Sequence, residues 1–156
     1  MFCEYCGDID GDETGVDHDE RDCPRYDTAD GPVTIDPGQL AAALTANADG
    51  VPALRAAINL LTAHGLWIKR LADRPELLHI DYSGPTPEPY GIDWEKVVQA
   101  VDAKELPASS GELRILALAA SLAHSAVRIP LGDTVSGLDT ANLDLVLTAI
   151  AEANGR

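Results

Sequence analysis

The chain has 156 residues, of which 46% are hydrophobic and 4% aromatic, and its formal net charge is −15. This length accommodates one domain with its own core, and a composition dominated by alanine and leucine favours helices. The negative charge argues against a basic patch for nucleic acid and suits a partner with a basic surface. We predict a mainly α fold of about five helices with a small β-hairpin and a zinc-stabilised N-terminal segment.

The N-terminal segment, residues 1–31, is acidic and poor in aliphatic side chains. Residues 1–36 carry twelve Asp and Glu against two Arg, whereas residues 37–156 carry fourteen acids against nine bases. Such a segment cannot build a core, so a bound metal would have to order it. We therefore divide the chain into an acidic metal-binding segment, 1–31, and a helical domain, 36–156.

All three cysteines lie in the first 23 residues, together with a histidine. Their spacing is C-x2-C, then eleven residues, then H-x4-C, which gives the four soft ligands of a tetrahedral Zn²⁺ site. The predicted ligands are Cys3, Cys6, His18 and Cys23. Because protein groups would fill every coordination position, we predict a structural zinc rather than a catalytic one.

The C-x2-C-G and H-x4-C halves resemble those of a zinc knuckle, although eleven residues separate them in place of four. The resemblance implies metal binding alone, since the basic and aromatic residues that hold single-stranded nucleic acid are missing. Two alternatives stay open: free thiols or a Cys3–Cys6 redox pair, and a calcium loop. The loop has Asp8, Asp10 and Asp12 at EF-hand positions, but it lacks the central glycine and the final glutamate.

The helical domain begins with Asp36-Pro37-Gly38, which predicts an N-cap at Asp36 and a helix to about Asn47. A second helix starts near Pro52. It either ends at Gly65 or continues past this glycine to about residue 73.

Residues 77–82 alternate as in a β-strand, and a loop rich in proline and glycine, residues 84–91, follows them. A return strand at 90–92 would complete a hairpin. Tyr82 and Tyr90 lie beside this loop, where they would form an exposed recognition edge.

Three further helices follow, over about 94–104, 111–125 and 139–154. Their predicted N-caps are Asp93, Ser109 or Ser110, and Asp139, with Asp133 capping a short helical turn before the last helix. The helix over 111–125 is apolar nearly all round, which predicts a central position. In the last helix, the predicted buried stripe is Leu143, Val146, Leu147 and Ile150. Residues 109–154 resemble a tail found in uncharacterised actinobacterial and actinophage proteins, a resemblance that implies no activity.

The remaining polar candidates favour structure over catalysis. We expect structural or surface roles for His64, His79 and His124, and core positions for Trp67 and Trp94. Ser110 and His124 lack the motif of a nucleophile and its base. The carboxylates of Asp133, Asp139 and Asp144 fit caps and an exposed helix face better than a cluster.

No sequence feature points to an enzyme, so we predict a non-enzymatic interaction or regulatory module that binds a protein partner. The alternatives are an acidic inhibitor that mimics nucleic acid, for example one encoded by a phage, and a structural component of an assembly such as a virion. The acidic N-terminus lacks the basic and apolar parts of a signal peptide, and no run is long enough for a membrane span. We expect a cytoplasmic protein.

Overall fold

Helices make up most of the described chain, which runs from residue 33 to residue 156 in this computed structural model. The helices are α1 (Pro37–Asn47), α2 (Pro52–His64), α3 (Trp67–Ala72), α4 (Trp94–Asp102), α5 (Ser110–Ala123), α6 (Leu131–Ser136) and α7 (Thr140–Ala153). Strands β1 (Leu78–Asp81) and β2 (Glu88–Ile92) form an antiparallel hairpin, preceded by a 3-10 turn at Pro75–Leu77. The predicted fold class, mainly α with a small hairpin, is confirmed.

The helix count exceeds the predicted five because two short helices, α3 and α6, join the longer ones. Of the two predicted alternatives for the second helix, the first is correct: the helix ends at Gly65, which separates α3 from α2. Its φ of +81° is left-handed, and its N–H donates to the carbonyl of Leu61 at 3.3 Å. Glycine adopts this conformation at little cost, so it ends α2 and turns the chain into α3.

Four helices begin at side chains that the sequence predicts as N-caps. The carboxylates accept backbone N–H groups as follows: Asp36 from Gln39 at 2.9 Å, Asp93 from Lys96 at 3.1 Å and Asp139 from Asn142 at 2.8 Å. For α5 the cap is Ser109 rather than Ser110. The Ser109 hydroxyl accepts the Glu112 N–H at 3.3 Å, and the Glu112 carboxylate accepts the Ser109 N–H at 2.7 Å, which completes a capping box.

The predicted cap at Asp133 is wrong, because α6 begins at Leu131 and Asp133 lies within its first turn. The position before the helix is Pro130, whose side chain has no polar atom to cap it. No side chain caps this helix, and the Thr134 hydroxyl donates to the Pro130 carbonyl at 2.9 Å. An acidic residue in the first turn still favours the helix by interacting with its dipole.

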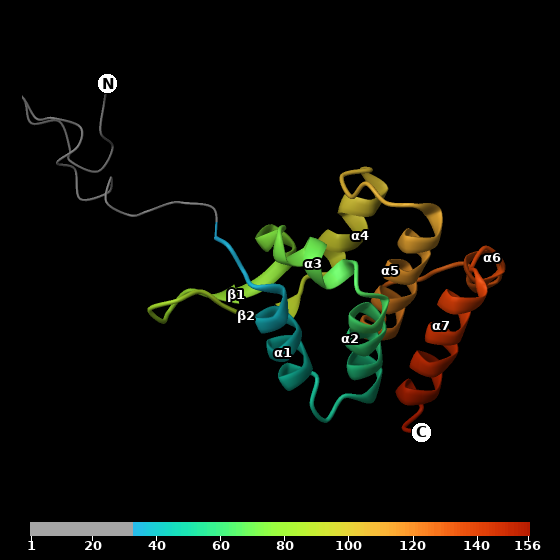
Figure 1. Cartoon of the computed structure of the whole chain (residues 1–156), viewed down its shortest axis with the longest axis horizontal. Coiled ribbons are helices and arrows are strands. Elements are labelled where there is room, and N and C mark those ends of the chain that lie inside the picture. The colour runs from blue at the N-terminus through green and yellow to red at the C-terminus, as the bar shows by residue number, and fades with distance from the viewer. Residues whose placement is uncertain (1–32) are drawn as a thin grey trace, which may run out of the picture. The chain divides into compact units, whose positions relative to one another are not determined.

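Helices α2 and α5 share the centre of the domain. Helix α2 packs on α1, α3, α5 and α7, and α5 packs on α2, α4, α6 and α7 (Figure 1). Trp67 is fully buried beside them, and its ring N–H donates to the Glu112 carbonyl at 2.9 Å, which ties α3 to the start of α5. Trp94 is buried as well, so both tryptophans are core residues, as predicted. None of the helices within residues 33–156 is long and apolar enough to cross a bilayer.

The predicted buried stripe on the last helix is only partly correct. Val146 is buried, and Ala149 joins it, whereas Leu147 and Ile150 are 55% and 45% exposed. Helix α7 packs on α2 and α5 and lies at one end of the row of helices in Figure 1. A helix at the end of a row buries one stripe, so the apolar residues on its other side stay in contact with solvent.

Candidate functional site

The hairpin carries a β-bulge at Tyr90. The Cα partners on either side of it are His79 with Gly91 and Ile80 with Pro89. Tyr90 is therefore an extra residue on β2. Because side chains alternate along a strand, the extra residue lets both Pro89 and Ile92 be buried while Tyr90 stays exposed.

The exposed face of the hairpin presents aromatic rings. His79 stacks on Tyr90 with 5.7 Å between the ring centroids and 20° between their planes. Gly91 makes room for this pair, since a Cβ at this position would lie 3.3 Å from Cδ2 of His79. Tyr90 is 50% exposed and Tyr82, next to the loop, is 62% exposed. The predicted exposure of the two tyrosines is confirmed. Such rings are typical of binding surfaces because they are apolar yet carry a polar end.

A groove of about 800 Å³ lies between the hairpin and α1. Helix α1 packs on β2, and Figure 1 shows the hairpin loop projecting beyond the helices on this side of the domain. The lining residues are Gln39, Ala42, Ala43 and Asn47 from α1, and Ile80, Asp81, Glu88, Pro89 and Tyr90 from the hairpin. The volume falls in the range of roughly 300–1,000 Å³ that is typical of ligand sites, so the groove has room for a short segment of chain.

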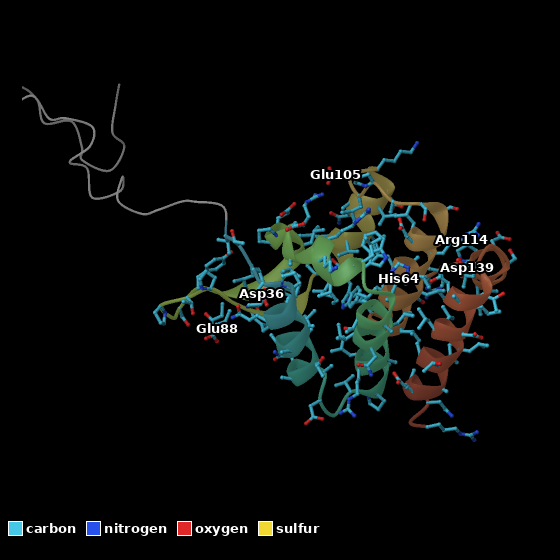
Figure 2. The ribbon with its side chains drawn as sticks, viewed as in Figure 1. Asp36, His64, Glu88, Glu105, Arg114 and Asp139 are labelled. Atoms are coloured by element: carbon cyan, nitrogen blue, oxygen red, sulfur yellow. The ribbon has the colours of Figure 1, made fainter. Side chains whose placement is uncertain are left out.

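The groove is acidic. Asp81 and Glu88 line it, and no Lys or Arg occurs in residues 33–54 or 75–95, which contain α1 and the whole hairpin. Figure 2 shows a third carboxylate, Asp36, at the start of α1 on the same side of the domain as Glu88. In the part of the chain that the structure describes, no ion pair includes any of these three residues. No ion pair within residues 33–156 therefore neutralises the negative charge of the groove.

Asp81 is held in its charged form. The backbone N–H of Ser83 donates to its carboxylate at 2.8 Å, and this hydrogen bond lowers the pKa of Asp81. A carboxyl group with a lowered pKa is ionised at neutral pH, so it suits the binding of a cation better than proton donation. The lining contains no serine, cysteine, lysine or histidine, and so the common pairs of nucleophile and base are not assembled there.

The histidines and serine considered for catalysis lie apart from one another. Ser110 begins α5 and His124 follows its last residue. A helix of 14 residues rises about 1.5 Å per residue, which places these two residues about 20 Å apart. They therefore cannot act together as nucleophile and base. His64 ends α2, and His79 belongs to β1, so the three histidines come from three different elements.

The predicted zinc ligands Cys3, Cys6, His18 and Cys23 lie outside the described residues, as do the aspartates of the possible calcium loop. Between residues 33 and 156, no group of three or more His, Cys, Asp or Glu side chains is placed to hold a metal ion. The metal sites that the sequence suggests thus all lie in the N-terminal segment.

The described residues form a small helical domain with an acidic groove between α1 and the hairpin. No family model, curated protein or solved structure matches the chain.

Sequence reasoning finds the tyrosines of this surface but misses the groove and the bulge. Pro89 and Gly91 are the signal of the bulge, since both residues are rare inside regular strands and common at bulges. The groove has no comparable local signal, because α1 and β2 are separated by the whole of α2 and α3 in the sequence.

Proposed function

We propose that this protein is a non-enzymatic interaction module that binds a protein partner through the groove between α1 and the hairpin. In this proposal, Zn²⁺ bound by Cys3, Cys6, His18 and Cys23 orders the acidic N-terminal segment. The observation that carries the proposal is the exposed Tyr90 beside two carboxylates that have no cationic neighbour in the described chain.

Two physical arguments support a binding role over a catalytic one. Large aromatic side chains lose little conformational entropy when they are covered, and they contribute strongly at the centres of interfaces. Carboxylates without cationic neighbours attract a partner of opposite charge and set its orientation. Both features meet on one surface here, and the groove lining lacks a nucleophile with its base.

The test is affinity capture from the native host with the full chain as bait. The double variant Tyr82→Ser/Tyr90→Ser should reduce the amount of a specifically captured protein by at least tenfold. A matched control, Leu147→Ser/Ile150→Ser, removes two similarly exposed apolar side chains from α7 and should leave capture unchanged. Circular dichroism verifies that both variants keep their helices.

The proposal fails if the tyrosine variant captures as much protein as the wild type. It also fails if the α7 variant alone loses the captured protein, since the binding surface would then be α7. A further variant, Cys3→Ser, separates the two parts of the proposal, because it removes a predicted zinc ligand and leaves the groove intact.

A further inference from the structure

We infer that the groove between α1 and the hairpin binds an arginine-bearing peptide segment, with the guanidinium between the ring of Tyr90 and the carboxylates of Asp81 and Glu88. This inference rests on the proposed function and specifies the chemistry of the partner. Its first support is the charge of the groove, which Asp81 and Glu88 line and to which α1 and the hairpin contribute no Lys or Arg.

Four acidic side chains outside the groove have a basic partner within residues 33–156. The ion pairs join Asp49 with Arg55, Glu76 and Glu105 with Arg74, and Asp93 with Lys96. The groove carboxylates have no such neighbour in the part of the chain that the structure describes. A cation brought by a partner would therefore meet charge that is not already compensated.

The aromatic rings favour arginine over lysine. A guanidinium is planar, so it can stack on an aromatic face while its edge donates to a carboxylate in two parallel hydrogen bonds. Among the described residues, Arg70 already makes a cation–π contact, since its Cζ lies 5.5 Å from the ring centroid of Trp67. Tyr90 is held in place by His79, so the ring on the groove side is oriented before a ligand binds.

Other occupants fit the charge poorly. Residues 1–32 of the same chain contain eleven acids and two Arg, so their net charge has the same sign as that of the groove. A second copy carries the same net charge of −15, and a nucleic acid carries a negative charge on every phosphate. A metal ion alone lacks ligands, because no set of three metal-binding side chains comes together in the described residues.

The test is a titration of the full ¹⁵N-labelled chain with a capped heptapeptide of alternating alanine and arginine, followed by NMR. Two further peptides carry lysine or uncharged citrulline in place of arginine. The arginine peptide should shift the amide signals of α1 and the hairpin, and it should bind at least tenfold more tightly than the citrulline peptide and at least threefold more tightly than the lysine peptide.

The variant Asp81→Asn/Glu88→Gln should weaken binding of the arginine peptide by at least tenfold. A matched control, Asp133→Asn/Asp144→Asn, changes the net charge equally at exposed positions on α6 and α7 and should stay within twofold of the wild type. Salt should weaken binding to the wild type.

The inference is overturned if the signals that shift belong only to residues 1–32, since the acidic segment would then be binding the peptide. It is also overturned if lysine and arginine peptides bind equally, or if the two double variants weaken binding equally. If the peptide fails while capture of a protein still depends on Tyr82 and Tyr90, this inference is wrong and the proposed function stands.

Discussion

Arg114 lies directly against Gly137, so that the guanidinium fills the space in which a side chain at position 137 would begin. A Cβ built on Gly137 would overlap the guanidinium of Arg114. Figure 2 shows Arg114 at the corner of the domain where α5 meets the turn before α7, close to the labelled Asp139. A missing side chain in the turn thus allows a long one from α5 to pack over it.

This relationship predicts that the effect of one substitution depends on the other. Gly137→Ala should destabilise the protein by at most about 0.5 kcal/mol, because the far end of the flexible Arg114 side chain must move aside. In an Arg114→Ala background the same change should be neutral, or stabilise by about 0.5 kcal/mol, since alanine reduces the entropy of the unfolded chain. The backbone permits it, because Gly137 has an ordinary φ of −101°. Urea unfolding of the wild type, the two single variants and the double variant measures the coupling energy between residues 114 and 137.

The control for this cycle is Gly132, around which no atom lies within 4 Å of an added Cβ. Gly132→Ala should have the same effect with and without Arg114. If Gly137→Ala and Arg114→Ala are additive to within about 0.3 kcal/mol, the packing of the two residues does not contribute as argued.

Trp67 should matter more to stability than Trp94, although both rings are buried. Replacing either by phenylalanine removes similar volume, but only at Trp67 does the ring N–H donate to a carbonyl, that of Glu112. The free energy of unfolding should therefore fall by about 1 kcal/mol more for Trp67→Phe than for Trp94→Phe. Equal losses in urea unfolding would show that the hydrogen bond adds nothing to the packing of the ring.

The features that the sequence predicts well are those that depend on neighbours along the chain. Asp36, Asp93 and Asp139 each cap a helix through the N–H three residues later, so the pattern alone is sufficient. The left-handed end of α2 at Gly65 is only half predicted, since the sequence left open whether the helix ends at this glycine or continues past it.

The features that the sequence does not predict depend on elements that meet from far apart. Periodicity marks Leu147 and Ile150 as apolar, but it cannot tell which stripe of α7 meets α2. The groove likewise exists only because α1 packs on β2. This is why the tyrosines could be proposed as a recognition edge while the acidic groove beside them could not.

Zinc binding is expected to be separable from the fold of the helical domain. Purified wild-type protein should contain about one equivalent of zinc, and Cys3→Ser or Cys23→Ser should lose it. The domain from Thr34 onward has its own core, so its helical signal and its unfolding midpoint should not change. Elemental analysis and circular dichroism measure the two effects.

Asp10→Asn is the matched control for the metal, since it alters the possible calcium loop and none of the four predicted zinc ligands. It should retain zinc. Wild-type protein without zinc would refute the metal site, and loss of helical signal in Cys3→Ser would refute the independence of the domain.

The capping box of α5 should make stability depend on pH. The backbone N–H of Ser109 donates to the Glu112 carboxylate and lowers the pKa of this residue, with help from the charges of Arg70 and His64. The unfolded chain therefore binds the proton more tightly than the folded chain does. The ionised carboxylate contributes its full stability above the ordinary glutamate pKa of about 4.3. This stability is lost as the pH falls through the lower pKa of the folded state.

Glu112→Gln keeps a side-chain acceptor but cannot ionise. The wild type should be more stable than this variant from pH 7 to pH 5, and the difference should shrink below about pH 4. Urea unfolding at each pH measures it, and a difference that stays constant down to pH 3 would show that the charge of Glu112 does not stabilise the helix.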